Sequence, residues 1–343
     1  MRLQRTLARS GAASPRGDGH PLIELMLTRL AEGSRRRART DQAVIALAIE
    51  GGGWHGVVSA GMCVLLEKAG LIDAVDLIYG TSSGALNGSF TAAGQAAMGS
   101  TNYLDTTANP EFANPLRMLK GRAVINFDFL FEELISRRKP YDPQGLAAGP
   151  TFAALGVDLA SSELQLLSSF STVEELTMAV RASCSLPLLS GAPVSFRGRP
   201  IGDGSLIESL PYATASRQAT HVLVLRSRPV GHRLGQYPRA LIELAHRAAH
   251  PAVAPLMQDR PDRYNAEAEH LERTGLDDAG LLQITPPLDT PRIGQLEWSR
   301  QAIREGLLAG AGAAAAAFGL PAVDILWQPE IYTVGGTADA PVP

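Results

Sequence analysis

Residues 75–84 read VDLIYGTSSG, and this stretch decides the class of fold. Its apolar first half is typical of a short buried strand, and residues 85–97, rich in small side chains, are predicted to form a helix. Between them Gly80 and Gly84 flank Ser82 in the pattern G-x-S-x-G. A strand, a sharp turn and a helix are the context in which this pattern carries a serine nucleophile. Ser82 is therefore a candidate nucleophile at a helix N-terminus, where free N–H groups favour developing negative charge.

A similar unit lies directly upstream. Residues 43–50 (AVIALAIE) form a continuous apolar run, as in a buried strand of a parallel sheet. Gly51, Gly52 and Gly53 follow in the sequence GGGWHG, and a predicted helix comes next. Two successive strand–turn–helix units indicate an α/β fold with a parallel sheet. In such a sheet both turns lie at the carboxyl edge of the strands, on the same side of the molecule.

The glycine run suits an anion, because successive glycines let backbone N–H groups converge without obstruction. The chain lacks the Gly-Lys-Ser/Thr of a P-loop, and the acid that a dinucleotide site needs about 20 residues later falls before the second strand. An oxyanion hole formed by the N–H groups of Gly51, Gly52 and Gly53 fits better, since the candidate nucleophile lies one unit later. The alternative is a glycine turn that serves close helix packing.

A serine nucleophile needs a general base. Asp203 lies between Gly202 and Gly204, either as a turn former or as a placed functional carboxylate. The histidines are poorer candidates. His221 opens a predicted strand. His246 is paired at i, i+4 with His250 on a helix predicted over residues 239–250, but Arg247 stands where a zinc motif needs Glu.

The composition excludes several classes of protein. The chain has 343 residues, a formal net charge of −3 and 2 cysteines. It is long enough to bury a core without a disulfide or metal staple. The near-neutral charge argues against nucleic acid as a partner. Two cysteines exclude a disulfide framework or a four-cysteine zinc site. No apolar run approaches the roughly 18–20 residues that span a bilayer.

Four segments are expected along the chain. Residues 1–42 form a flexible N-terminal segment with a short amphipathic helix, for which docking on the protein is favoured over contact with an anionic membrane. Residues 43–215 form the catalytic domain. Residues 216–332 form a C-terminal α/β extension on the same core, including a long helix over residues 293–317, and residues 333–343 are a disordered tail.

The three motifs, in this order, resemble the patatin-like phospholipase family over about residues 43–215. Members have G-G-G-x-R-G, then G-x-S-x-G, then D-G-G or D-G-A. This chain reads AIEGGGWHG, YGTSSGALNG and IGDGSLIESLP, and the segment RASCSLP before the third motif also resembles the family. The resemblance implies a three-layer α/β/α fold with a mainly parallel central sheet.

The resemblance also implies a Ser–Asp dyad without histidine. Ser82 attacks the carbonyl of a lipid acyl ester and forms an acyl-enzyme, and Asp203 accepts the serine proton and later activates water. The activity expected is that of a phospholipase A, a lysophospholipase or a lipid esterase, with the acyl pocket shaped by residues 100–170. No cofactor or metal is expected. The protein is expected in the cytoplasm, with peripheral membrane contact through its substrate. The supporting motif positions are His55, Gly56, Gly80, Gly84, Gly202 and Gly204.

Two positions depart from the family pattern. His55 stands where members usually have Arg, which is credited with supporting the oxyanion loop, so either the loop is held differently or activity is reduced and pH-dependent. Ser205 stands where the third motif ends in Gly or Ala, and because serine is also small, this change is expected to matter less. Three alternatives stay open: an α/β-hydrolase with a triad of Ser82, Asp203 and His221 or His246, a catalytically weak protein that binds lipid or a partner, and an acyltransferase that shares the acyl-enzyme.

Overall fold

The computed structural model describes residues 19–120, 123–186, 189–274, 278–294 and 297–321. Its centre is an eight-stranded sheet of order β5-β6-β3-β2-β1-β7-β8, with β4 paired to β3. The strands are β1 (Ile45–Ile49), β2 (Leu77–Thr81), β3 (Thr151–Asp158), β4 (Glu163–Leu167), β5 (Val194–Phe196), β6 (Arg199–Asp203), β7 (His221–Leu225) and β8 (Leu281–Ile284). Neighbours from β3 through β2, β1 and β7 to β8 pair in parallel, and the β3–β4, β3–β6 and β5–β6 pairs are antiparallel.

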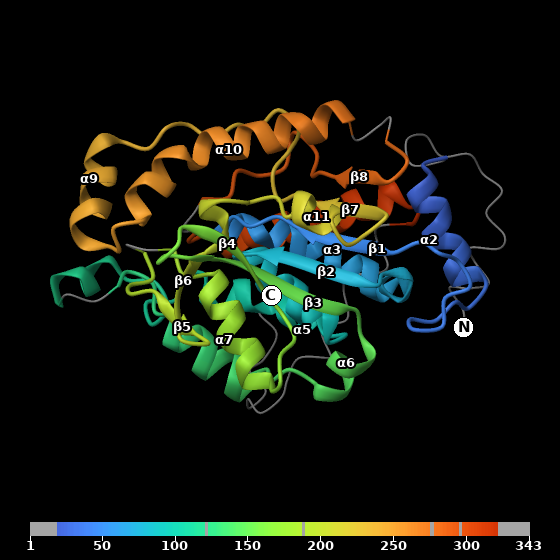
Figure 1. Cartoon of the computed structure of the whole chain (residues 1–343), viewed down its shortest axis with the longest axis horizontal. Coiled ribbons are helices and arrows are strands. Elements are labelled where there is room, and N and C mark those ends of the chain that lie inside the picture. Colours follow the sequence, from blue (N-terminus) through green and yellow to red (C-terminus); the bar gives the residue numbers. More distant parts are fainter. Residues whose placement is uncertain (1–18, 121–122, 187–188, 275–277, 295–296, 322–343) are drawn as a thin grey trace, which may run out of the picture.

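Helices cover both faces of this sheet, which gives the three-layer α/β/α arrangement (Figure 1). They are α2 (Pro21–Ala31), α3 (Gly56–Lys68), α4 (Ser83–Ala92), α5 (Ala96–Thr106), α6 (Pro143–Ala148), α7 (Val173–Ser183), α8 (Tyr212–Ser216), α9 (Arg239–Ala248), α10 (Val253–Thr274) and α11 (Arg300–Ala317). Shorter or irregular turns are η1 (Gly53–His55), η2 (Leu71–Ala74), η3 (Pro115–Lys120), the π-helix η4 (Phe129–Arg138) and η5 (Gly204–Leu206). The predicted fold class, an α/β sandwich with a mainly parallel sheet, is confirmed.

The two faces of the sheet differ in the size of their side chains. In β1 Ile45, Leu47 and Ile49 point into the larger core, with residues of α3, α4, α5, α7 and α11. The alternate residues Ala46 and Ala48 point to the other face, where they meet α8 and α10. Successive side chains of a strand point to opposite faces, so the large side chains of β1 all face one helical layer. The small side chains of Ala46 and Ala48 let α10 pack close to the opposite face of the sheet.

Two helices differ from their predicted bounds for local reasons. The helix predicted over residues 85–97 is two helices, α4 and α5. Gly94 adopts a φ of 68° after the end of α4, and the Gln95 N–H turns back to the carbonyl of Phe90 at 2.8 Å. The helix predicted over residues 293–317 begins at Arg300, because the Ser299 side chain caps it. A left-handed glycine and a side-chain cap are the usual helix stop and start signals.

Several elements were absent from the sequence-based prediction, and one prediction was wrong. Strand β3 and the 22-residue helix α10 were not predicted; α10 contains Pro261 in its interior, which normally argues against a helix. The helix predicted to carry both His246 and His250 ends at Ala248. His250 lies beyond it and its Nδ1 accepts the Ala252 N–H at 3.3 Å, so the two histidines do not share a helix face.

The N-terminal helix α2 docks on the protein. Leu22 and Met26 are completely buried in the larger core. Arg29 donates to Asp41 at 2.6 Å and to Asp76 at 2.7 Å. These contacts agree with the docking interpretation of this helix. Residues 1–18 and the tail predicted over residues 333–343 lie outside the described part of the chain.

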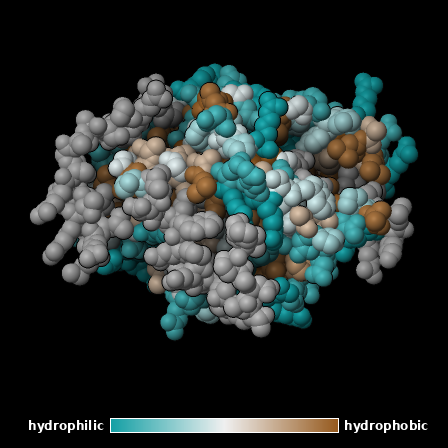
Figure 2. Space-filling model, turned by 180° about the vertical axis from the view of Figure 1, so that it is seen from behind, coloured by the Kyte–Doolittle hydropathy of each residue, from teal (hydrophilic) through white to brown (hydrophobic). Residues whose placement is uncertain are grey.

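Within the described ranges, none of the helices has the length and apolar character needed to cross a membrane. Figure 2 shows the face opposite to that of Figure 1, where hydrophobic residues form separate groups among hydrophilic ones.

Candidate active site

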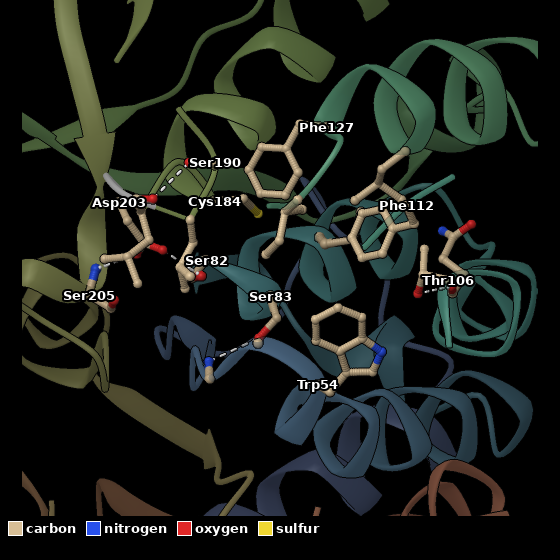
Figure 3. A pocket seen from close by; sticks show the side chains of 18 of the residues that line it. Trp54, Ser82, Ser83, Thr106, Phe112, Phe127, Cys184, Ser190, Asp203 and Ser205 are labelled. Atoms are coloured by element: carbon tan, nitrogen blue, oxygen red, sulfur yellow. Dashed lines mark hydrogen bonds between the residues drawn. The ribbon is translucent and has the colours of Figure 1, made fainter. Parts of the chain in front are cut away.

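The register of the sheet brings Ser82 and Asp203 to the same level at one edge. Strand β2 ends at Thr81, which pairs with Leu155 of β3. The next residue of β3, Gly156, pairs with Asp203 at the end of β6. Strand β4 pairs along one edge of β3 from Ala154 to Asp158, so β2 and β6 share the other edge, with β6 directly beyond the end of β2. The Ser82 Oγ donates to Asp203 Oδ2 at 2.8 Å, although the residues are 121 positions apart (Figure 3).

The turn that carries Ser82 has a strained backbone. Ser82 adopts φ 55° and ψ −126°, in a region that L-residues rarely occupy. A Cβ on Gly80 would lie 2.4 Å from the Gly84 carbonyl oxygen, and one on Gly84 would lie 2.2 Å from the Ile49 carbonyl oxygen. Real Cβ atoms do not approach so closely, so both motif glycines are required. Strain of this kind is concentrated at functional sites, which agrees with the expected role of the turn.

A serine that the sequence reasoning did not single out fixes this turn. Ser183, at the end of α7, accepts the Ser82 N–H at 3.0 Å with its Oγ. The same hydroxyl donates to the Leu155 carbonyl of β3 at 2.5 Å. Ser183 belongs to the RASCSLP segment that resembles the family, which was the available signal. It ties the candidate nucleophile to β3, the strand that pairs with both β2 and β6.

Asp203 is 2% exposed and both of its carboxylate oxygens are engaged. Oδ2 accepts from Ser82, and Oδ1 accepts the Ser205 N–H at 2.8 Å. Burial raises the pKa of Asp203 above its usual value, despite hydrogen bonds from Ser205 and Ser82 that lower it. Burial likewise raises the pKa of the neighbouring Cys184 thiol, which therefore stays protonated. The arrangement holds a serine hydroxyl against a carboxylate whose affinity for a proton is increased.

The glycine loop offers fewer free amides than the sequence predicted. The Gly51 N–H donates to the Ser209 carbonyl at 3.1 Å, and the Gly52 N–H donates to Ser83 Oγ at 3.0 Å. Within the described ranges, the Gly53 N–H has no acceptor, and neither has the N–H of Ser83 at the start of α4. Gly53 and Ser83 both line the pocket that contains Ser82. Of the amides considered for an oxyanion hole, those of Gly51 and Gly52 are engaged, so the three predicted glycine amides are reduced to that of Gly53, beside that of Ser83.

Two side chains hold the carbonyls of this loop. His55 Nδ1 lies 3.1 Å from the Gly52 carbonyl oxygen, and because that oxygen can only accept, Nδ1 carries the proton. Arg228, beyond the end of β7, donates from Nη1 to the Gly51 carbonyl at 3.2 Å and to Glu50 Oε1 at 2.7 Å. A histidine on one side and an arginine that follows β7 on the other thus hold the carbonyls of this loop.

The charges around the loop are fixed near neutral pH. Burial, with a further contribution from Arg228, lowers the pKa of His55 to about 4, so this imidazole is neutral. Glu50 is completely buried. Burial opposes its ionisation, but Arg228 and Arg226 outweigh that effect and lower the pKa of Glu50. A neutral histidine and a buried ion pair thus support the loop without titrating near pH 7.

The pocket beside Ser82 is mostly apolar. Its volume, the open mouth included, is about 910 Å³. Asp203 and Ser205 lie on one side of Ser82, and Trp54, Phe112 and Thr106 lie on the other (Figure 3). Apolar walls come from Phe112, Ile125 and Phe127, between α5 and η4, and from Leu130 at the start of η4. The prediction that residues 100–170 shape the pocket is confirmed for this part.

The remaining predicted positions lie as follows. Gly56 begins α3, Gly202 lies in β6 and Gly204 begins η5. His221 begins β7 and pairs with Ile45, the first residue of β1, so it lies at the opposite edge of the sheet. Among the described residues that line the pocket there is no histidine. Ser82 and Asp203 thus contact each other directly, and His221 lies away from both.

The model of the patatin-like phospholipase family matches residues 47–216. The uncharacterised protein YjjU of Escherichia coli (strain K12) is 30% identical over 188 residues, which cover 53% of this chain and 51% of that protein. The chain thus spans about half the length of this curated relative.

Two solved structures match this chain at lower sequence identity. VipD from Legionella pneumophila has a TM-score of 0.41 at 12% identity, covering 81% of this chain and 67% of that chain. The structure of full-length SpcU in complex with full-length ExoU from Pseudomonas aeruginosa also matches, with a TM-score of 0.25 at 16% identity. This match covers 70% of this chain and 53% of the matched chain.

Proposed function

Residues 47–216 of this chain belong to the patatin-like phospholipase family, and on that premise we propose that the protein is a serine hydrolase of lipid acyl esters. The observation that carries the proposal is the 2.8 Å hydrogen bond from Ser82 Oγ to Asp203 Oδ2 on the wall of an apolar pocket. An apolar pocket suits an acyl chain, and a serine paired with a buried carboxylate suits nucleophilic attack on its ester.

The reaction proceeds in two halves. Ser82 Oγ attacks the ester carbonyl carbon while its proton passes to Asp203 Oδ2. The tetrahedral intermediate collapses, the C–O bond to the alcohol breaks, and Asp203 returns the proton to the departing oxygen. This leaves an acyl-enzyme on Ser82. In the second half Asp203 takes a proton from water, the resulting hydroxide attacks the acyl carbon, and Ser82 recovers its proton as the fatty acid leaves.

Two features of the site support these steps. The free N–H groups of Gly53 and Ser83 stabilise the negative oxygen of each tetrahedral intermediate, a contribution worth about 100–1000-fold in rate per donor. An aspartate with an ordinary pKa near 4 is a weak base for a hydroxyl. The burial that raises the pKa of Asp203 makes it a stronger base once it is ionised.

Hydrolysis of p-nitrophenyl octanoate tests the proposal. Ser82→Ala and Asp203→Asn are each expected to lower kcat/KM by about 1000-fold or more, because each removes one member of the pair. Ser216→Ala is the matched control, since this exposed serine on α8 donates to the Tyr212 carbonyl and is outside the pocket. Full activity in either Ser82→Ala or Asp203→Asn, with circular dichroism spectra unchanged, would overturn the proposal.

A further inference from the structure

One buried arginine of this protein lacks the partner that the others have. Four arginines in the described part of the chain are at least nine-tenths buried. Three of them contact carboxylates: Arg29 with Asp41 and Asp76, Arg226 with Glu272, and Arg228 with Glu50. Arg260 of α10 is 4% exposed, and none of the described carboxylates lies within 4.0 Å of it. A buried cation without a counter-charge is costly, so this arrangement calls for an explanation.

The contacts of Arg260 leave part of its guanidinium unused. Its Nε donates to the Ser205 carbonyl at 2.8 Å, and its Nη1 donates to the hydroxyl of Tyr237. A guanidinium has five N–H groups, so three are left without an acceptor among the described residues. Arg260 also lines the pocket that contains Ser82. Arg260 is therefore a fixed cation on the wall of the proposed active site, with N–H groups free to bind a ligand.

Arg260 belongs to one end of that pocket. It holds the carbonyl of Ser205, and the N–H of the same Ser205 donates to Asp203 Oδ1. Ser205 and Asp203 lie on one side of Ser82, and the apolar wall with Phe112 lies on the other side (Figure 3). The pocket thus has a cationic end and an apolar end, with the candidate nucleophile between them. A substrate with its ester between an acyl chain and an anionic group matches this order.

We propose that Arg260 binds the phosphate group of a glycerophospholipid whose acyl chain occupies the apolar end of the pocket. This inference rests on the proposed function and names its substrate class. A guanidinium is planar, always charged and presents paired donors that match phosphate oxygens. A neutral lipid ester would leave Arg260 buried and unpaired. The residue therefore selects phospholipids over neutral acylglycerols, from a helix outside the segment that matches the family.

The test measures binding without turnover, on the full chain with Ser82→Ala. The probes are 1-O-octylglycerol 3-phosphate and its neutral partner 1-O-octylglycerol, which carry ether links that cannot be hydrolysed. Titration calorimetry below their micellar concentrations gives the two dissociation constants. We expect the phosphate to tighten binding by about tenfold or more when Arg260 is present. Arg260→Met is expected to abolish that preference and to leave binding of the neutral lipid within about twofold.

Arg263 provides the matched control. It lies on the same helix and donates to the Leu206 carbonyl at 2.9 Å, next to the carbonyl that Arg260 holds, but it does not line the pocket. Arg263→Met should keep the phosphate preference. Arg260→Lys should keep part of it, because the charge remains while the fork of donors is lost. Arg260→Lys keeps the test valid if Arg260→Met fails to fold.

Four results would overturn the inference: no phosphate preference with Arg260 present, a preference that survives Arg260→Met, an equal loss in Arg263→Met, and binding of inorganic phosphate as tight as that of the lipid phosphate. The last would assign the site to soluble phosphate. Arg260 could instead serve as a distant counter-charge for Asp203. In that case Arg260→Met, with Ser82 intact, would slow p-nitrophenyl octanoate and lysophospholipid equally, whereas we expect a raised KM for the phospholipid.

The outcomes separate this inference from the proposed function. If the protein with Ser82 hydrolyses no ester but the phosphate preference depends on Arg260, the hydrolase proposal fails and the phosphate site stands. If p-nitrophenyl octanoate is hydrolysed through Ser82 and no phosphate preference is found, the hydrolase stands and the phosphate site fails.

Discussion

Replacing Arg228 by Met tests whether the buried ion pair supports the glycine loop. Arg228 is 3% exposed and Glu50 is completely buried, and their closest atoms lie 2.7 Å apart. Arg228→Met leaves Glu50 with the Ser227 N–H, the Tyr264 hydroxyl and the more distant Arg226. Removing one partner of a buried pair typically costs about 3–5 kcal/mol, and we expect a loss of that size in the free energy of unfolding.

The same substitution should affect catalysis through the loop. The Gly51 carbonyl loses its hydrogen bond from Arg228, so the amide of Gly53 is held less precisely against the oxyanion. A misplacement of about 1 Å can cost about 100-fold in rate. We expect kcat for p-nitrophenyl octanoate to fall by about 10–100-fold, with KM changed by less than about threefold.

The assay combines urea denaturation with steady-state kinetics on four proteins: the parent, Arg228→Met, Glu50→Gln and the double variant. The double variant should be more stable than the sum of the single effects predicts, with a coupling of about 0.5–3 kcal/mol, because it removes both charges together. Arg137→Met is the control, since its pair with Glu133 is exposed and contributes little. A loss below about 1 kcal/mol in Arg228→Met, with kcat unchanged, would refute the reasoning.

Three further predictions follow from buried contacts. Ser183→Ala leaves the Ser82 N–H and the Leu155 carbonyl without their partner, so we expect urea denaturation to show a loss of about 1–3 kcal/mol and kcat to fall; unchanged kcat would contradict the role given to this hydroxyl. Trp54→Ala opens the apolar end of the pocket, so the ratio of kcat/KM for the dodecanoyl to the octanoyl p-nitrophenyl ester should rise about tenfold, and an unchanged ratio would place the chain elsewhere. Burial raises the pKa of Glu267 from 4.5 to about 8, so between these values the native protein keeps a proton that the unfolded chain has lost. Stability should therefore fall as pH rises through this window, by at most about 1.4 kcal/mol per pH unit, and Glu267→Gln should flatten the profile of thermal midpoints; equal slopes in both proteins would refute the assignment.

The sequence predicts this fold well where local signals agree. Apolar runs followed by glycine turns located β1 and β2, and the order of the three motifs pointed to Ser82 and Asp203 as partners. The contact between these two residues depends on the register of β2, β3 and β6, which brings positions 121 residues apart to one level. Strand β3 itself was not predicted, so the geometry of the pair could not be derived from the sequence.

The residues that hold the site in place could not be predicted from the sequence for the same reason. Arg228 reaches the glycine loop because β7 pairs with β1, and that neighbourhood follows from the strand order. Arg260 lies on α10, which was not predicted because its sequence is polar and has Pro261 in its interior. The Gly51 amide is engaged by the Ser209 carbonyl, a contact between distant segments that no local pattern indicates. Tertiary pairing thus decided which of the predicted donors are free.

Reaction of the purified protein with a fluorophosphonate probe tests the central claim, that Ser82 is a nucleophile activated by Asp203. The account predicts one adduct, mapped to Ser82 by mass spectrometry, that is lost in Ser82→Ala, strongly slowed in Asp203→Asn and retained in Ser216→Ala. The rate of labelling should increase with pH through a pKa above the ordinary aspartate value, because burial raises the pKa of Asp203 and the carboxylate must be ionised to take the proton. No adduct between about pH 6 and pH 9, or labelling at full rate in Asp203→Asn, would contradict the account.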